Sequence, residues 1–356
     1  MRSFGGVCTI DSSGFRGVKV KKIGVLFGME QTFPPALVEK INSMRLPDIT
    51  AEAVKVGGVK MAVPSDYAVI VDRISHDIPF YRGMLKNAVL TGTHVINNPF
   101  WWSADDKFFN YALAEKLGVA VPPTVLLPHK EHPPSTTDQS HRNLMFPLNW
   151  EEIFAYVGWP AFLKPFDGGG WKDVYKVDNP HEFFEAYDKT RDLCMTLQRG
   201  VNFKEYFRCY VVGQEHVHIM QYDPRAPHHE RYVKNAPPVD PKLLDRVRKD
   251  ALTLCRALGY DLNTVEFAVE DGVPYAIDFM NPAPDADVNS VGIDNFEWIV
   301  KHVADLAVKK AQSTTPPLTE LRWAAFLNGD GDHETITKKA PEKKAASKKS
   351  TKVAAR

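Results

Sequence analysis

The most informative stretch of this chain is Phe162-Leu163-Lys164-Pro165-Phe166-Asp167-Gly168-Gly169-Gly170-Trp171. Its apolar start predicts a strand, and Lys164 puts a positive charge where that strand runs into three glycines. Glycines let a backbone approach phosphate closely, and their amides form a nest for anions. The Gly-Lys-Ser/Thr of a Walker loop is missing, and no helix opens here as it does in a Rossmann loop. The stretch therefore predicts either a phosphate loop of another kind or a flexible hairpin.

Two acidic residues, Glu266 and Asp278, stand on neighbouring predicted strands nearer the C-terminus. Residues 265–269 and 274–280 predict a hairpin that turns at Asp271-Gly272. Because alternate residues of a strand share a face, the two carboxylates are expected side by side over an apolar sheet. Magnesium suits such a pair, since it takes carboxylates together with nucleotide phosphates. Two unrelated surface acids near turns are the alternative.

The first third of the chain alternates apolar runs with helix-like stretches, which indicates an α/β layer. A hairpin is expected around Gly57-Gly58, and another further on at Gly213-Gln214. Ser103 is expected to cap a helix that carries Lys107. The predicted strands of the α/β layer cover residues 22–28, 67–71 and 94–96, and its predicted helices cover residues 33–44 and 79–91.

Composition excludes several classes of protein. The chain has 356 residues, 44% of them hydrophobic and 25% charged, which excludes a wholly disordered, fibrous or membrane protein. Its 44 basic and 44 acidic residues cancel, yet residues 335–356 hold seven Lys, one Arg and one Glu. We expect this basic tail either to bind nucleic acid or another polyanion loosely, or only to add solubility. Four cysteines without a Cys-x-x-Cys pair favour the cytoplasm, and no membrane partner is expected.

In their order along the chain, these features resemble the ATP-grasp superfamily of ATP-dependent ligases. Members of that superfamily place one lysine on the helix that enters the central domain and a second lysine before a mobile glycine loop. A hinge holds adenine through main-chain groups, and acidic residues on late strands hold magnesium. The resemblance covers roughly residues 22–312, and its matching segments are residues 103–107, 117–124, 162–170, 197–201, 208, 234–235, 266 and 278–281.

The resemblance implies a mixed α/β and α+β ATP-grasp fold with an N-terminal α/β domain, and with ATP and Mg²⁺ or Mn²⁺ as cofactors. The residues it assigns to ATP are Lys107, Lys164, Gly168, Gly169, Gly170, Gln198, Arg199, Val201 and Lys234. The residues it assigns to the metal are Glu266, Asp278 and Asn281, and Arg208 is expected near the phosphates as a catalytic residue.

The region around Arg73 is similar to the corresponding stretch of bacterial glutathione synthetases, where it faces the acid substrate. The similar residues are Asp72-Arg73, Pro79, Tyr81 and residues 95–99. Arg73, as a second catalytic residue, and Arg82 are therefore candidates for a carboxylate clamp, because guanidinium binds carboxylate in a bidentate fork. Surface salt bridges are the alternative for both arginines.

Three positions depart from the superfamily pattern. The last metal motif is Asp278-Phe279-Met280-Asn281, one residue longer than the usual Glu-x-Asn. Arg199 stands where an acidic hinge residue is common, and Glu205-Tyr206-Phe207-Arg208 replaces a plain Asp-x-Arg. These changes leave room for a non-catalytic relative.

By this resemblance the chain is an ATP-dependent carboxylate–amine ligase that forms an acylphosphate and releases ADP and phosphate. Its substrates would be a small carboxylate and an amine, among them amino acids or a peptide, and it would form a homodimer. A kinase-like phosphotransferase and a non-catalytic ATP-binding regulator are the alternatives. The expected parts are a flexible extension (1–20), an N-terminal domain (21–102), a central lid (103–197), a C-terminal subdomain (198–315) and a linker with the basic tail (316–356).

Overall fold

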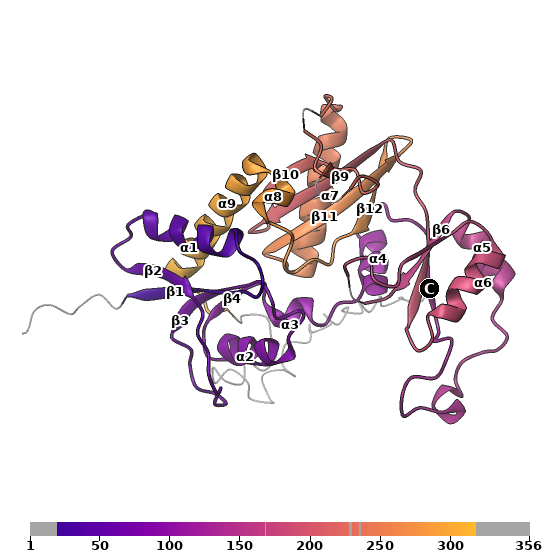
Figure 1. Cartoon of the computed structure of the whole chain (residues 1–356), viewed down its shortest axis with the longest axis horizontal. Helices are drawn as coiled ribbons and strands as arrows, with labels where there is room; N and C mark the ends of the chain where they lie inside the picture. Colours follow the sequence, from indigo (N-terminus) through magenta and orange to yellow (C-terminus); the bar gives the residue numbers. More distant parts are fainter. Residues whose placement is uncertain (1–19, 168, 228–229, 235, 318–356) are drawn as a thin grey trace, which may run out of the picture. The chain divides into compact units, whose positions relative to one another are not determined.

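A computed structural model describes residues 20–167, 169–227, 230–234 and 236–317 of the chain. Most of the predicted N-terminal extension and nearly all of the predicted linker and tail lie outside the described residues, as do Gly168 and Asn235. Within the described part, three four-stranded sheets and the helices around them build the fold (Figure 1). The boundaries of the predicted domains stay predictions.

The first sheet is parallel, as its alternation of strands and helices predicts. Its central strands β1 and β3 are apolar and fully buried at Ile23, Val25, Val69 and Val71, as expected of a sheet covered on both faces. The strand order is β2 (Ile49–Ala53), β1 (Lys21–Leu26), β3 (Tyr67–Asp72) and β4 (His94–Ile96), with helices α1 (Phe33–Ser43) and α2 (Pro79–Leu90).

The hairpin expected around Gly57-Gly58 is wrong. Only β2 forms a strand there, and it pairs in parallel with β1 rather than with a strand that follows it. Val59, Met61 and Val63 beyond the glycines are all exposed, so this segment has no apolar face to bury. The segment therefore remains a surface loop between β2 and β3.

The second sheet is antiparallel and belongs to the central part of the chain. Two helices pack on it through an aromatic cluster in which Phe183 is fully buried against Trp150 and Phe154. The strand order is β5 (Thr124–Leu127), β8 (Met195–Arg199), β6 (Ala161–Pro165) and β7 (Tyr175–Val177), and the helices are α5 (Trp150–Val157) and α6 (Pro180–Lys189). A 3₁₀ turn, η1 (Asp138–His141), lies in the long loop after β5.

The third sheet is also antiparallel, and both hairpins predicted for it are confirmed. They turn at Gly213-Gln214 and at Asp271-Gly272, all four with positive φ. The strand order is β10 (His216–Gln221), β9 (Glu205–Val212), β11 (Leu262–Glu270) and β12 (Val273–Asp278). The remaining helices are α3 (Pro99–Trp102), α4 (Lys107–Lys116), α7 (Pro241–Leu258), α8 (Val288–Val291) and α9 (Ile293–Gln312).

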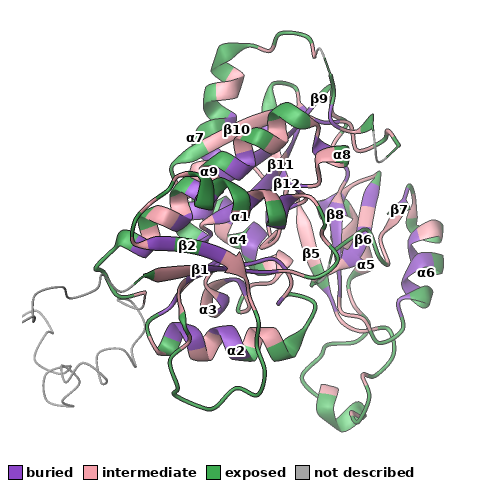
Figure 2. Ribbon diagram, turned by 60° about the vertical axis from the view of Figure 1, so that its left-hand side comes forward, coloured by how far each residue is buried: buried purple, intermediate pink, exposed green. Residues whose placement is uncertain are grey.

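The first and third sheets share one buried core. Ile23 of β1, Tyr210 of β9 and Val303 of α9 belong to the same apolar cluster. Figure 2 colours the ribbon by burial and shows buried stretches in α9 and in the strands of the third sheet. The buried side chain of Asn97 crosses this joint, because its amide group donates to the carbonyl oxygens of Leu262, at 2.6 Å, and Pro282, at 3.0 Å. In the described part of the chain, no helix combines the length and the apolar character that crossing a membrane requires.

Candidate active site

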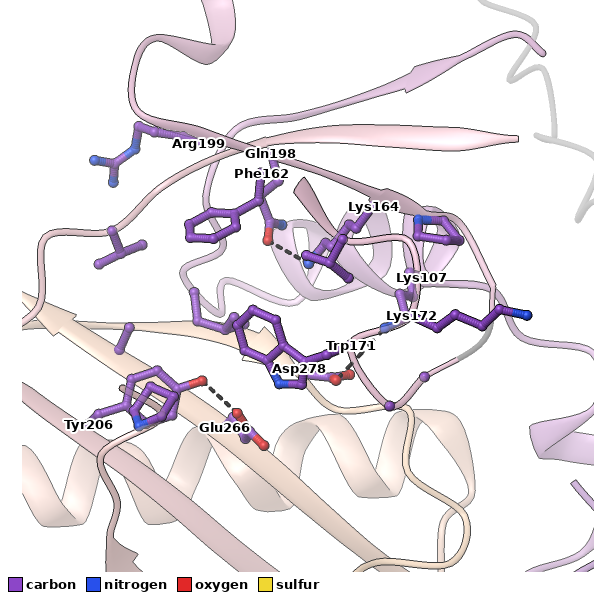
Figure 3. Close-up of a pocket in the computed structure, with 18 of the residues that line it drawn as sticks. Lys107, Phe162, Lys164, Trp171, Lys172, Gln198, Arg199, Tyr206, Glu266 and Asp278 are labelled. Carbon is purple, nitrogen blue, oxygen red and sulfur yellow. Dashed lines mark hydrogen bonds and ion pairs between the residues drawn. The ribbon is translucent and has the colours of Figure 1, made fainter. Parts of the chain in front are cut away.

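An open pocket lies between the second and third sheets and takes its walls from both (Figure 3). Strand β6 and the glycine-rich loop after it form one side, while β11 and β12 form the other. The apolar part of the wall includes Phe162, Val201, Phe203, Ala268 and Ile277. Largely apolar walls with a few convergent charges are typical of a site for a small ligand.

Lys164 enters the pocket from β6 and is almost wholly buried. Its ammonium group donates to the hydroxyl of Tyr111 at 2.6 Å and to Oε1 of Gln198 at 2.8 Å. The other end of the Gln198 amide donates to Thr124 Oγ1 at 2.8 Å, so the amide oxygen faces the lysine. Burial lowers the pKa of Lys164 to about 7, and the charge of Lys107 adds to the shift. An anion bound beside Lys164 would favour its charged form and oppose this shift.

Lys107 reaches the pocket from the first residue of α4. Its ammonium group lies 3.8 Å from a carboxylate oxygen of Asp278. Its backbone N–H donates to the carbonyl of Phe166 at 2.8 Å, which ties the helix to the start of the glycine-rich loop. The cap expected at Ser103 is wrong: Asp106 caps α4, because its side chain accepts from Phe109 N, whereas the hydroxyl of Ser103 donates to Pro99 O.

Glu266 and Asp278 stand opposite one another on β11 and β12, and the register shifts directly beyond this pair, where Ile277 is an extra residue on β12. One oxygen of Glu266 lies 3.2 Å from Arg208 Nη1, and the other accepts the hydroxyl of Tyr206 at 2.5 Å. Burial raises the pKa of Glu266; Arg208 opposes this shift and Asp278 adds to it. Asp278 faces the pocket with its side chain 44% exposed.

Arg208 and Asn281 lie beside Glu266 but are not among the residues that line the pocket. The amide group of Asn281 donates to Thr264 Oγ1 at 2.7 Å, and Thr264 shares the face of β11 that carries Glu266. Among the described residues, Nε of Arg208 is buried without a hydrogen-bond partner. Arg208 thus pairs with Glu266 from within the third sheet, and Asn281 is held by Thr264; neither lines the pocket.

The predicted hinge lies along β8 and the residues after it. Gln198, Arg199 and Val201 all line the pocket. The guanidinium of Arg199 points away from the pocket, because it pairs with Glu270 at 2.7 Å and lies over the ring of Tyr275 (Figure 3). The charge that departs from the superfamily pattern is therefore neutralised outside the site.

The glycine-rich loop contributes Gly169 and Gly170 to the wall of the pocket. Gly170 has φ of +70°, a conformation that favours glycine. Gly168, the first of the three predicted glycines, lies outside the described residues.

Three predicted residues do not meet the others. Arg73 is buried where the first sheet meets the loop after β12, paired with Glu30 and donating to Pro284 O at 2.6 Å. Lys234 is exposed and does not line the pocket. Arg82 lies over the ring of Trp102, 5.7 Å from its centre. The substrate-binding role of Arg73 and Arg82 and the ATP-binding role of Lys234 stay predictions.

Sequence reasoning missed Tyr111, Tyr206 and Trp171. Tyr111 follows Lys107 by four residues, so a helical period places both on one face of α4. Tyr206 precedes Arg208 by two residues, so the period of a strand places both on one face of β9. Trp171 directly follows the last glycine of the loop and lines the pocket. All three signals were present in the sequence.

The acidic pair suits a magnesium ion that is bound by the two carboxylates and by phosphate together. In the part of the chain that the structure describes, no three His, Cys, Asp or Glu side chains are grouped so as to hold a metal by themselves. Two facing carboxylates repel one another, and a cation between them relieves that repulsion. Magnesium commonly takes one or two carboxylates together with water and nucleotide phosphates. Glu266 and Asp278 offer the two carboxylates of such a set.

Comparison with solved structures finds the same architecture in ATP-grasp ligases. VanG D-Ala:D-Ser ligase from Enterococcus faecalis matches with a TM-score of 0.59 at 15% identity, over 82% of this chain and 100% of that chain. D-alanine–D-alanine ligase from Bacillus anthracis complexed with ATP matches with a TM-score of 0.54 at 16% identity, over 82% and 97%. The chain has an ATP-grasp fold.

A third match of this fold is a ligase solved with a peptide. The ATP-grasp ligase PsnB complexed with precursor peptide PsnA2 and AMPPNP has a TM-score of 0.56 at 14% identity, over 82% of this chain and 98% of that chain. No protein-family model matches the chain. The fold predicted from the sequence is thereby confirmed, while these low identities carry no information on substrates.

Proposed function

We propose that this chain is an ATP-dependent carboxylate–amine ligase that works through an acylphosphate. The observation that carries the proposal is one pocket in which two lysines, Lys107 and Lys164, face two carboxylates, Glu266 and Asp278. These groups suit a triphosphate with its metal, since the lysines neutralise phosphate and the carboxylates hold a cation. The ATP-grasp fold supports this proposal, because the similar solved proteins reported above are ligases.

The nucleotide would lie along the pocket with its base at the hinge. Phe162 and Val201 offer apolar surface there, and main-chain groups of the hinge would hydrogen-bond the adenine. Lys107 and Lys164 would bind the phosphates, and Glu266 and Asp278 would hold magnesium, with Asn281 steadying the strands beside them. Bound magnesium would neutralise the charge that develops on the phosphates.

The reaction would have two steps. An oxygen of the substrate carboxylate attacks the γ-phosphorus of ATP, the bond to the β-phosphate oxygen breaks, and acylphosphate and ADP form. The amine then attacks the acyl carbon, phosphate leaves with its bonding electrons, and the nitrogen loses a proton to give an amide. The protein contributes mainly position and charge neutralisation, as Lys107 and Lys164 illustrate.

A nucleotide-binding protein without turnover is the second candidate. The placement of Asn281 favours it, because this predicted metal ligand bonds Thr264 and does not line the pocket. A site with two rather than three metal ligands would still bind ATP but would hold magnesium less firmly.

The decisive experiment supplies the protein with MgATP, a pool of small carboxylic acids and a pool of amino acids and short peptides. Hydroxylamine is added in a parallel reaction, because it captures an acylphosphate as a hydroxamate. We expect ADP release that needs an acid, hydroxamate in the trap, and loss of both in Lys164→Ala and Asp278→Ala. Lys301→Ala, which changes an exposed helix pair, is the matched control.

The outcomes separate the candidates. Amide formation with a free amine supports the ligase. ADP release with a stable phosphorylated product, indifferent to amines, supports a phosphotransferase. ATP binding without turnover across all pools favours the second candidate, and failure to bind ATP contradicts both.

A further inference from the structure

The hinge turn, residues 199–202, is held from outside the pocket by one acidic side chain, Glu270. Its Oε2 lies 2.7 Å from Nη1 of Arg199, and its Oε1 accepts from the backbone N–H of Asn202 at 2.8 Å. One carboxylate therefore joins the first and the last residue of the hinge turn. Glu270 is not among the residues that line the pocket, so it acts on a bound ligand only through the hinge turn.

The ion pair between Glu270 and Arg199 is shielded from solvent. The two side chains are 21% and 25% exposed, and the guanidinium of Arg199 lies 5.2 Å from the centre of the Tyr275 ring. Figure 3 shows Arg199 turned away from the pocket. Burial alone would raise the pKa of Glu270, but the hydrogen bonds from Arg199 and Asn202 lower it below its ordinary value. Glu270 is therefore charged at neutral pH, and both of its oxygens are used.

The other side of the hinge turn is fixed to the second sheet. The N–H of Arg199 donates to Pro123 O at 2.9 Å, and the N–H of Gly200 donates to Pro160 O at 2.7 Å. A Cβ on Gly200 would lie 2.9 Å from that same carbonyl oxygen, so this close approach requires glycine. The hinge turn is therefore held between the second sheet and the end of β11.

These contacts leave one backbone N–H of the hinge turn for a ligand. The N–H groups of Arg199, Gly200 and Asn202 are all bonded, whereas that of Val201 has no hydrogen-bond partner in the part of the chain that the structure describes. Val201 lines the pocket. An unpaired donor beside apolar side chains favours a ligand that brings an acceptor, because unpaired polar groups are costly away from water. The ring nitrogens of a nucleotide base are such acceptors.

Strand β11 carries the hinge carboxylate and the metal carboxylate on one face. Glu266, Ala268 and Glu270 alternate along the strand, so their side chains share a face. Glu266 and Ala268 line the pocket, and Glu270 follows at the end of the strand. At about 3.4 Å per residue, the two carboxylates stand roughly 14 Å apart along β11. The strand thus supports the two ends of the pocket separately.

We propose that Glu270 positions the hinge turn for the base of the nucleotide. This inference rests on the proposed function, and it adds a positioning residue that lies outside the pocket. Through Arg199 and Asn202, the carboxylate holds Val201 where its N–H meets a ring nitrogen of the base. Arg199 then serves as the partner of Glu270, which accounts for a basic residue where the superfamily commonly has an acidic one. Loss of the carboxylate frees the hinge turn and weakens recognition of the base, while the phosphate end of the pocket keeps its contacts.

Two nucleotides that differ only in their base test this positioning role. Calorimetric titration with Mg-AMPPNP and with Mg-GMPPNP gives the ratio of their dissociation constants, which isolates the base. We expect the wild type to favour one of the two at least about tenfold, and Glu270→Ala to reduce that preference several-fold. Glu270→Gln, which keeps an acceptor for the N–H of Asn202 but loses the charge, should fall between them. Glu215→Ala, which breaks an exposed ion pair with Lys309, is the matched control and should keep the wild-type ratio.

A double variant tests whether Arg199 acts through Glu270. Arg199→Ala should reduce the preference as Glu270→Ala does, and combining the two should add little, since both remove the same contact. Fully additive losses overturn the pairing. An unchanged ratio in Glu270→Ala, an equal loss of affinity for both nucleotides, or a wild type without preference overturns the positioning role and leaves the ligase proposal standing. A wild type that binds neither nucleotide overturns both.

Discussion

The ammonium group of Lys164 shows how one residue can serve a site and cost stability together. Its two hydrogen bonds, to Tyr111 and Gln198, are made to neutral groups, so burial is only partly compensated. Because Lys107 lies in the same pocket, the two positive charges also repel one another. An anion bound there would stabilise the site, as the proposed phosphate-binding role of Lys164 requires.

Lys164→Met tests the low pKa of this lysine through stability. A lowered folded-state pKa means that the folded protein is penalised for holding the proton. That penalty is complete below about pH 7 and disappears as pH rises toward the unfolded value near 10.5. We therefore expect the melting temperature of Lys164→Met, relative to wild type, to shift upward as pH falls from 10 to 6.5. A flat or opposite trend in calorimetric scans contradicts the assigned pKa.

Gly259 and Gly272 form a matched pair for a second test at single residues. Both have positive φ, at +74° and +76°, but a Cβ on Gly259 would lie 3.0 Å from Trp101, whereas one on Gly272 would meet open space. Alanine at Gly272 should lower the free energy of unfolding by about 1 kcal/mol, from the left-handed backbone alone. Alanine at Gly259 should cost clearly more in urea titrations. Equal losses would mean that Trp101 does not pack there.

Sequence reasoning at this scale found the residues that a local motif marks. Lys107, Lys164 and the acidic pair stand in recognisable segments, and the structure brings them into one pocket. Arg73 shows why contacts between residues far apart in the sequence were harder to predict. Its partner Glu30 is 43 residues away in sequence, and nothing local indicates that Glu30 occupies its guanidinium.

The β11–β12 hairpin is the element that places both carboxylates. Its period of two put Glu266 and Asp278 on one face in the prediction, and the register confirms that they are opposite one another. The register shift after Glu266, where Ile277 is the extra residue on β12, was not predicted for that position, because a bulge leaves no mark in an apolar run such as residues 275–277. The hairpin predicted at Gly57-Gly58 does not form, and β2 pairs with β1 instead. A glycine pair marks a turn but does not specify which strand β2 joins.

The cross-strand pair of Arg208 on β9 and Glu266 on β11 carries a prediction about sheet stability. Both side chains are largely buried, at 12% and 18% exposed. Arg208→Ala leaves Glu266 without its cation, so we expect the free energy of unfolding to fall by about 3–5 kcal/mol. The control Lys301→Ala breaks an exposed pair on α9 and should cost less than about 1 kcal/mol. Similar losses in the two variants, measured by urea unfolding, would contradict the placement of Glu266.

Across the whole molecule, the first and third sheets behave as one structure because they share a core and a polar joint. Asn97 donates to two carbonyl oxygens and accepts from the backbone N–H groups of Asp261 and Leu262, both at 2.8 Å. None of these partners is near Asn97 in sequence, so composition and periodicity indicated the parts of the fold but not this joint.

Asn97→Ala should therefore loosen both sheets together. Removing four hydrogen bonds at a buried position should lower the free energy of unfolding by about 3 kcal/mol or more. In hydrogen exchange, amides of β1 and of β11 should lose protection in parallel. The control is Asn87→Ala. The side chain of Asn87 ties α2 to the exposed loop at Ala62 and Val63, and its removal should leave β1 and β11 protected. Loss confined to β1 would show that the sheets unfold separately.

The measurement that tests the central claim most directly is calorimetric titration of the wild-type chain with AMPPNP, with and without magnesium. We predict one nucleotide per chain with magnesium present. Affinity for AMPPNP should be weaker by at least about tenfold in Lys164→Ala, since a hydrogen bond to a charged group contributes about 1.5–3 kcal/mol. Affinity should fall by a similar factor without magnesium, because the phosphates then face Glu266 and Asp278 without a cation between them. No binding in the presence of magnesium, or equal affinity in Lys164→Ala, would contradict the assignment of this pocket to ATP.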